Sequence, residues 1–197
     1  MSYKILSFDV GIKNLAYCIL KYNTEDNSDI TIIKWNIIPL LDKNEKCKGF
    51  PLDELTKRMY EHLNKEFYSY DIDIVLLENQ PVLKNPVMKS VQMILFSYFQ
   101  YQKIMLNRKI KLIKFINAGN KLKVGRNFNE INYNAEINAI KSKYTRNKKF
   151  AILYTDKILI DRLKDNKNNE YFNKHKKKDD LADAFLQAIY YIDFNKL

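Results

Sequence analysis

Hydrophobic and polar residues alternate at the start of the chain, and this pattern predicts β-strands. Over residues 3–10 the alternation places one set of side chains on each face of a strand. Two more strands are predicted over residues 15–22 and 30–38, with a polar turn at 23–29 between them. Residues 11–14 form only a tight turn, so the three strands follow one another closely. This spacing favours an antiparallel meander.

Beyond the meander, segments with helical spacing alternate with short apolar segments. Pro51 opens a helix that should end near Phe67, and Pro86 opens a longer helix that should end near Asn107. Strands are further predicted at 73–78 and 109–118, helices at 130–143, 145–162 and 179–193, a basic loop at 119–129 and a mobile polar connection at 165–178. The order of elements predicts an α/β fold, in which helices lie on the faces of a mixed sheet.

The composition is typical of a globular protein. The 197 residues suit one domain spanning 1–197, with 46% hydrophobic and 29% charged residues. No apolar run approaches the ~20 residues that cross a membrane, and the first residues lack the pattern of a signal peptide. We therefore expect no membrane association. Because only two cysteines occur, Cys18 and Cys47, we also expect a reducing, intracellular compartment.

The excess of positive charge comes from one segment of the chain. Residues 101–149 contain 13 Lys and Arg but only 2 Asp and Glu, whereas residues 1–100 contain 12 and 13. Such a concentration favours a polyanionic partner, and nucleic acid fits best. The alternative is an ordinary lysine-rich surface in contact with solvent.

Carboxylates stand at the ends of two apolar strands and at the start of the last helix. Asp9 and Glu78 end the strands, and Asp180 and Asp183 lie one helical turn apart. Each alone is explained by a cap, an ion pair or the helix dipole. If all four meet at one edge of the sheet, their repulsion is relieved by divalent cations, and oxygen ligands select Mg²⁺ or Mn²⁺. Two such ions can activate water and stabilise the leaving oxygen in phosphodiester hydrolysis.

Three blocks of sequence, in this order, resemble the RuvC branch of the ribonuclease H-like nucleases. The blocks are ILSFDVGIKNLAYCIL (5–20), VLLENQP (75–81) and KDDLADAFLQAIYY (178–191). They are most similar to the Holliday junction resolvases of poxviruses and other large DNA viruses, which are related to mitochondrial resolvases. The resemblance implies a ribonuclease H-like mixed sheet, in which parallel strands join the antiparallel meander and helices cover both faces.

The same resemblance implies an activity and its requirements. The expected enzyme is an endodeoxyribonuclease that resolves four-way DNA junctions by paired symmetrical nicks. It would use two Mg²⁺ ions per active site, with Mn²⁺ as a substitute, and act as a homodimer on branched DNA. The viral relatives favour a location in the host cytoplasm, at viral replication sites.

The resemblance also assigns roles to particular residues. The catalytic acids, which are also the metal ligands, fall on Asp9, Glu78, Asp180 and Asp183. Lys13 matches the lysine of a G-x-K-N turn and is expected near a phosphate. Within the basic segment, the predicted DNA contacts are Lys121, Lys123, Arg126, Lys148 and Lys149.

The chain departs from the bacterial branch at one position. That branch often has an aromatic residue three positions after the second acid, where this chain has Pro81. A residue that stacks on bases must therefore lie elsewhere, with Tyr98, Tyr101 and Phe128 as candidates. The additional acid Asp179 has no assigned role.

The helix predicted at 86–107 is a candidate for the dimer interface. It has apolar residues around much of its circumference, so it is either deeply buried or shared between subunits.

Three other functions remain open at this stage. A different ribonuclease H-like enzyme, such as a hybrid nuclease or a transposase, would have the same fold and metals. An actin-like or sugar-kinase-like ATPase also has a D-x-G turn after its first strand, but the four glycines here are few for its phosphate loops. A nucleic-acid binder without catalysis is the third.

Overall fold

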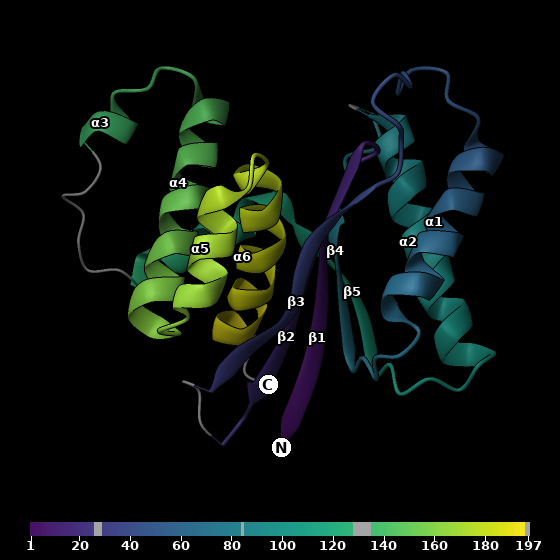
Figure 1. Ribbon diagram of the computed structural model, residues 1–197, viewed down its shortest axis with the longest axis horizontal. Coiled ribbons are helices and arrows are strands. Elements are labelled where there is room, and N and C mark those ends of the chain that lie inside the picture. Colours follow the sequence, from purple (N-terminus) through teal and green to yellow (C-terminus); the bar gives the residue numbers. More distant parts are fainter. Residues whose placement is uncertain (26–28, 84, 128–134, 196–197) are drawn as a thin grey trace.

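One five-stranded sheet forms the centre of the molecule in the computed structural model, which describes residues 1–25, 29–83, 85–127 and 135–195 (Figure 1). The strands lie in the order β3 (Ile30–Pro39), β2 (Asn14–Asn23), β1 (Ser2–Asp9), β4 (Ile74–Asn79) and β5 (Leu112–Asn117). β1, β2 and β3 pair antiparallel, whereas β4 runs parallel to both β1 and β5. The predicted meander with added parallel strands is confirmed.

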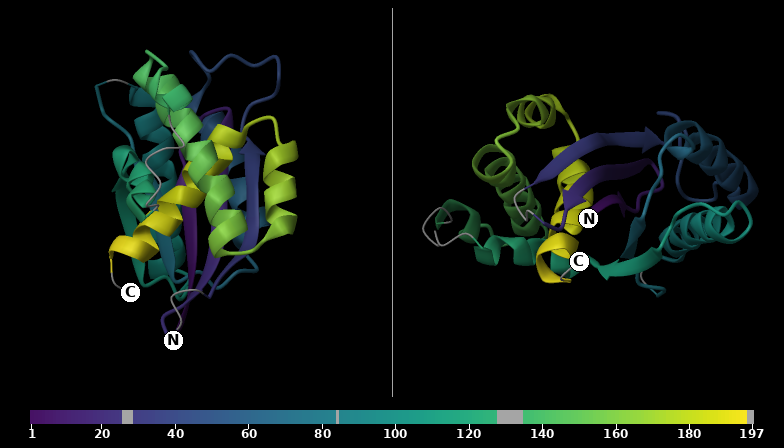
Figure 2. Two further views of the ribbon diagram at one scale, coloured as in Figure 1. Left: turned by 90° about the vertical axis from the view of Figure 1, so that its left-hand side faces the viewer. Right: turned by 90° about the horizontal axis from the view of Figure 1, so that it is seen from below.

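Helices cover both faces of this sheet, as predicted. α1 (Leu52–Phe67) and α2 (Pro86–Ile104) pack on one face. The other face carries α4 (Lys143–Lys157), α5 (Asn166–Lys174) and α6 (Lys178–Phe194). Seen from below, the sheet lies between the two helical layers (Figure 2).

The central strand shows why the early alternation does not separate buried from exposed positions. Ile5 packs in the core on the α6 side, while Leu6 and Phe8 pack in the core on the α1 and α2 side. All three side chains are fully buried, because helices cover both faces of β1.

α6 is buried around most of its circumference. Leu181, Phe185, Ala188 and Ile192 form one apolar stripe at helical spacing, but ten residues of the helix are buried. The helix lies between the sheet on one side and α4 on the other, so most of its circumference needs small or apolar residues. Gln187, also buried, donates from Nε2 to Ser7 Oγ at 3.0 Å and to the Phe8 carbonyl at 3.1 Å.

Two predicted connections are wrong, because both are helical. The basic loop at 119–129 is largely a 3₁₀ helix, η1 (Ala118–Asn127). The connection at 165–178 contains α5, whose first turn is capped by Asp165 accepting from the backbone N–H of Asn168. α5 has one buried residue, Phe172, which stacks on Trp35 with ring centroids 5.3 Å apart. Because only one residue of this helix is apolar and buried, the sequence shows no helical periodicity here.

Several other helices differ in length from the helices predicted from the sequence. Residues 130–134 of the helix predicted at 130–143 lie outside the described part of the chain, and within 135–142 the structure forms only the short helix α3 (Ala135–Asn138). α2 begins at Pro86 as predicted but ends at Ile104, and Asn107 then adopts a positive φ of 49° that leaves the helix. α4 continues into a π-helical turn, η3 (Ile158–Arg162). Of the helices described, none combines the length and the apolar character needed to cross a bilayer.

Candidate active site

The sheet and α6 bring the predicted acids to one edge. Asp9 ends β1 and Glu78 lies next to the end of β4, and because these strands are parallel both acids face the same edge. The turn after Asp9 is tight, since a Cβ atom on Gly11 would lie 2.1 Å from the Asn14 carbonyl oxygen. α6 adds Asp183 from its N-terminal half.

Lys121 of η1 stands in the middle of these acids. Its Nζ lies 2.5 Å from Asp183 Oδ2, 3.2 Å from Glu78 Oε1 and 3.9 Å from Asp9 Oδ1. We call the three acids Asp9, Glu78 and Asp183, together with Lys121, the acid cluster. The side chain of each is at most 21% exposed, so the carboxylates share one ammonium group away from bulk water.

Burial and mutual repulsion both act on the protons of the cluster. Burial raises the pKa of Asp9 well above its ordinary value, and the charge of Glu78 raises it further. Burial likewise raises the pKa of Asp183, to about 6, although Lys121 acts in the opposite direction. Burial alone would lower the pKa of Lys121, but the surrounding carboxylates outweigh it and the pKa is raised. The cluster therefore requires positive charge to remain ionised.

Asp180 lies beside the cluster with a partner of its own. Its Oδ2 accepts from Asn14 Nδ2 at 3.2 Å, and burial followed by the charge of Asp179 raises its pKa. Asp179, whose role the sequence left open, pairs with Lys148 of α4. Burial opposes the charge of Asp179, but the hydrogen bond and charge of Lys148 outweigh it and lower its pKa.

A cleft with a volume of about 560 Å³ opens over the acids. Helix α4 lines it with Tyr144, Asn147 and Lys148, and α2 lines it with Met88. Tyr144 is 69% exposed and lies over the ammonium of Lys148, 4.8 Å from ring centroid to Nζ. The cleft thus combines buried carboxylates with a basic, aromatic rim.

The donor set of the cleft suits hard divalent cations. Carboxylate oxygens are the ligands that Mg²⁺ and Mn²⁺ prefer, and a cation would relieve the repulsion that raises the pKa values of Asp9 and Asp183. As the side chains stand, no three acidic, His or Cys residues of the described ranges converge on a point where they could hold a metal ion. The ammonium of Lys121 lies between the carboxylates instead.

The predicted DNA-binding residues fall into two groups. Lys13, Arg126 and Lys149 are exposed. Lys123 is half-buried with its ammonium 5.8 Å from the Tyr190 ring centroid, and Lys148 is paired with an acid.

The structure places Lys121 differently from the sequence prediction. The sequence predicts a surface loop at this residue, whereas Lys121 belongs to a 3₁₀ helix that turns its side chain into the acids. The sequence offered no signal for this contact, because η1 has no regular apolar pattern.

The candidates for base stacking are also revised. Tyr98 is buried and its hydroxyl donates to Asn64 Oδ1 at 2.8 Å, so it cannot face DNA. Tyr101 is 53% exposed on α2 but does not line the cleft, and Phe128 lies outside the described residues. The exposed aromatic residue of the cleft is Tyr144, which sequence reasoning missed among the lysines of its segment.

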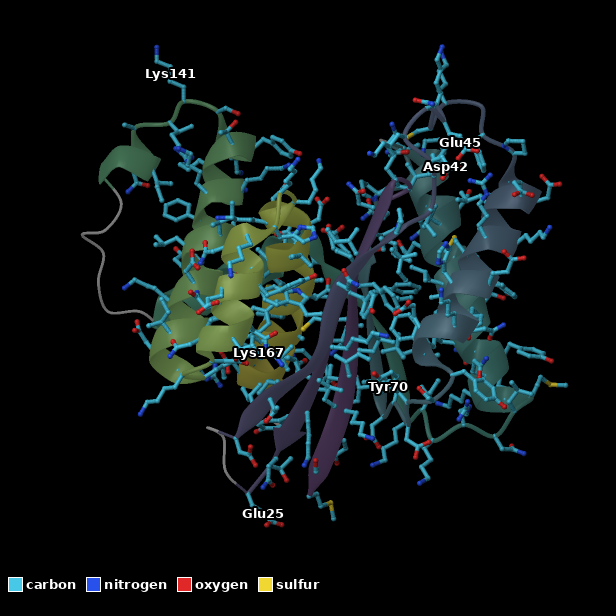
Figure 3. All side chains as sticks on the ribbon, in the orientation of Figure 1. Glu25, Asp42, Glu45, Tyr70, Lys141 and Lys167 are labelled. Atoms are coloured by element: carbon cyan, nitrogen blue, oxygen red, sulfur yellow. The ribbon has the colours of Figure 1, made fainter. Side chains whose placement is uncertain are left out.

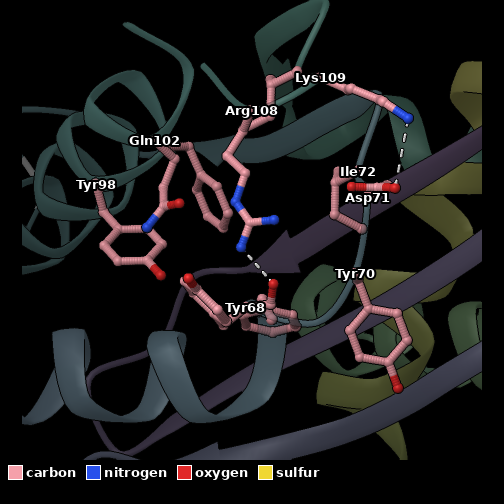
Figure 4. A pocket seen from close by; sticks show the side chains of 11 residues that line it. Tyr68, Tyr70, Asp71, Ile72, Tyr98, Gln102, Arg108 and Lys109 are labelled. Atoms are coloured by element: carbon pink, nitrogen blue, oxygen red, sulfur yellow. Dashed lines mark hydrogen bonds and ion pairs between the residues drawn. The ribbon is translucent and has the colours of Figure 1, made fainter. Parts of the chain in front are cut away.

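A second, smaller pocket lies at the far ends of α1 and α2 (Figure 4). Its volume of about 20 Å³ holds little more than one water molecule. Arg108 covers the ring of Tyr68 at 4.5 Å and donates to the Tyr68 carbonyl oxygen. None of the acids described above lines this pocket, and we do not regard it as the functional site.

The fold defines a class. A mixed sheet in this strand order, with helices on both faces, is the ribonuclease H-like fold that the RuvC-type resolvases share. Residues 5–82 match the family model described as mitochondrial resolvase Ydc2 / RNA splicing MRS1. The resemblance to Holliday junction resolvases that the sequence blocks indicated is confirmed.

Solved structures share the fold along nearly the whole chain. The yeast mitochondrial Holliday junction resolvase Ydc2 aligns with a TM-score of 0.64 and 21% identity, over 96% of this chain and 79% of that one. Fowlpox virus resolvase, solved with its substrate Holliday junction DNA, gives 0.58 and 23%, over 96% and 97%. RuvC of T. thermophilus, in complex with a Holliday junction substrate, gives 0.59 and 10%, over 100% and 98%.

One relative of known sequence comes from a large virus. Protein L451 of Acanthamoeba polyphaga mimivirus is 33% identical over 184 residues, which cover 90% of this chain. The match covers only 42% of the mimivirus protein, so the chain spans less than half the length of that relative.

Proposed function

We propose that the protein is an endodeoxyribonuclease that resolves four-way DNA junctions by paired nicks, through metal-dependent hydrolysis of phosphodiester bonds. The observation that carries the proposal is the acid cluster, in which carboxylates from β1, β4 and α6 surround one cationic centre at the base of a cleft. Carboxylates this close require a cation, and divalent cations in such sites serve phosphodiester hydrolysis.

The residues proposed to hold the metal are Asp9, Glu78, Asp180 and Asp183. Two Mg²⁺ ions, or Mn²⁺ in their place, would supply Lewis-acid activation of water and neutralise charge on the departing 3′ oxygen. Asn14 orients Asp180 through its hydrogen bond, and burial excludes competing water from the carboxylates. Lys121 balances the carboxylates before a cation arrives, and it can then move its flexible side chain towards a phosphate.

The phosphate backbone is proposed to lie along the basic rim of the cleft. Arg126, Lys149 and Lys13 are exposed, so they can reach phosphates without breaking a buried contact. Lys141, just before α4, points into solvent and extends the positive surface (Figure 3). Lys148 is available only if a phosphate replaces Asp179 as its partner. Titration with salt should show the strong decline in affinity that phosphate contacts produce.

A homodimer is proposed, with α2 as its interface. Apolar side chains on the outer side of this helix remain exposed, namely Met93 at 43%, Tyr101 at 53% and Ile104 at 65%. The edge strand β5 adds Phe115, which is 37% exposed beside Phe96. A second copy would cover this surface and place two cleavage sites at a fixed separation. Sedimentation should give a dimer at micromolar concentration, and a monomer there would contradict this arrangement.

The viral resolvase and the mimivirus relative favour a viral origin for the chain. We propose that it acts inside the host cell, at cytoplasmic sites of viral replication.

The direct test compares three labelled substrates with and without Mg²⁺: a four-way junction, an RNA–DNA hybrid and a plain DNA duplex. We expect symmetrical nicks in the junction, only with Mg²⁺, and little cleavage of the other two. Preferred cleavage of the hybrid would support another ribonuclease H-like nuclease, and junction binding without any cleavage would support a binding protein.

A further inference from the structure

A buried glutamine of α2 is linked to the acid cluster by two consecutive hydrogen bonds. Gln92 is fully buried, and its Oε1 accepts from the backbone N–H of Gln80 at 2.7 Å. The side chain of Gln80 then donates from Nε2 to Glu78 Oε2 at 2.6 Å. We call this series, from Gln92 through Gln80 to Glu78, the glutamine relay.

The hydrogen bonds of the relay lie where the chain leaves β4. Glu78 is followed by Asn79 at the end of β4 and then by Gln80, whose N–H would otherwise be unpaired next to a buried side chain. Lys89 strengthens the attachment, because its Nζ donates to Gln92 Oε1 at 3.2 Å and to Asn79 Oδ1 at 3.4 Å. α2 therefore fixes both residues that follow the acid.

The two oxygens of Glu78 consequently have different partners. Oε2 is held by Gln80, while Oε1 faces Lys121 at 3.2 Å in the centre of the cluster. A carboxylate with one oxygen held in this way cannot rotate freely, so the other oxygen keeps its direction. This is the role of an outer hydrogen bond on a metal-binding carboxylate.

The two ends of the Gln92 amide differ in importance. Its oxygen has two donors, but within the described residues its Nε2 is buried and has no hydrogen-bond partner. A buried donor without a partner is unfavourable, so packing alone does not account for an amide here. The acceptor oxygen is the functional part of this side chain.

We infer that Gln92 is a positioning residue, which fixes the orientation of Glu78 through Gln80. This inference rests on the proposed function, since it assumes that Glu78 binds a divalent ion. Two substitutions of Gln92 should therefore differ in their effect on metal binding. Gln92→Glu keeps the acceptor oxygen beside Lys89, whereas Gln92→Met removes this oxygen at similar side-chain volume.

The experiment measures Mn²⁺ binding to the protein without DNA by calorimetry, and the Mg²⁺ concentration that gives half-maximal junction cleavage. For Gln92→Met we expect Mn²⁺ affinity to fall by about 10-fold or more, as for other outer partners of metal ligands, with a matching shift in the Mg²⁺ requirement. Gln92→Glu should bind Mn²⁺ nearly as wild type does. Gln102→Met, a buried glutamine of the same helix outside the relay, is the matched control.

Melting temperature in EDTA shows whether each variant folds. If Gln92→Met fails to fold, Gln80→Met tests the same relay, because Gln80 is only half-buried and its side chain contributes the last bond. The inference is overturned if the folded relay variant binds Mn²⁺ as tightly as Gln102→Met does. If wild type binds Mn²⁺ but cleaves no junction, the proposed function fails, and the affinities still decide whether the relay positions Glu78.

Discussion

Single residues determine the balance between burial and charge in the cleft. Moving carboxylates away from water is unfavourable unless a cation accompanies them, and Lys121 is the cation that the described residues provide. The raised pKa values of Asp9 and Asp183 show that this compensation is incomplete.

Replacing Lys121 should make the fold depend on divalent ions. In EDTA, Lys121→Met leaves buried carboxylates without a partner, and we expect a loss of about 3 kcal/mol in the free energy of unfolding. Millimolar Mg²⁺ should recover most of this loss, because it binds the folded protein only. Urea unfolding with EDTA and with Mg²⁺ measures both effects, and Lys149→Met is the exposed control. Equal stability of Lys121→Met and wild type in EDTA would contradict the described cluster.

The pKa of Asp183 predicts a pH dependence of known sign. Burial raises it from 3.8 to about 6, so between these values the folded protein holds a proton that the unfolded chain has released. The contribution of Asp183 to stability therefore falls as pH rises through this range. Asp183→Asn has no such titration, so its free energy of unfolding relative to wild type should increase from about pH 4 to about pH 6. Urea unfolding in EDTA at several pH values tests this, and a constant or decreasing difference would refute it.

At the scale of elements, α6 joins the two halves of the sheet. Gln187 is buried against β1 and β4, and its Nε2 approaches Ser7 Oγ, the Phe8 carbonyl at 3.1 Å and the Leu76 carbonyl at 3.4 Å. These contacts set the height of α6 over the edge where β1 and β4 end. The acids of α6 depend on that placement.

Gln187→Met should therefore destabilise the protein by about 2 kcal/mol, since it removes buried hydrogen bonds without opening a large cavity. Urea unfolding gives the value, with Gln100→Met on the half-exposed side of α2 as control. A change as small as that of the control would mean that packing alone positions α6.

The elements also show how far the sequence predicts the fold. Strands and α1 were predicted closely, because alternation, continuous apolar runs and Pro51 are local signals. The sequence does not predict α5, because the helix is held by the stacking of Phe172 on Trp35, and these two residues lie far apart in the sequence. The acids were found from their positions at element ends, but Lys121 and Gln92 act through contacts between elements that no local pattern indicates.

At the scale of the whole molecule, the acids and the basic rim of the cleft lie at the same edge of the sheet. The acids come from β1, β4 and α6, and the rim comes from α4 in the segment that supplies the positive charge. The topology explains this arrangement, because the parallel pair β1 and β4 directs both strand ends to the same side. Binding of DNA and hydrolysis should therefore be separable by substitution.

Asp9→Asn tests that separation most directly. The variant removes one buried carboxyl group of the acid cluster and leaves the exposed lysines and arginines unchanged. Binding to a labelled four-way junction and cleavage with Mg²⁺ are measured side by side for wild type and variant. We expect unchanged junction affinity and no detectable nicks from Asp9→Asn, whereas nicking at the wild-type rate would contradict the assignment of the acid cluster as the catalytic centre.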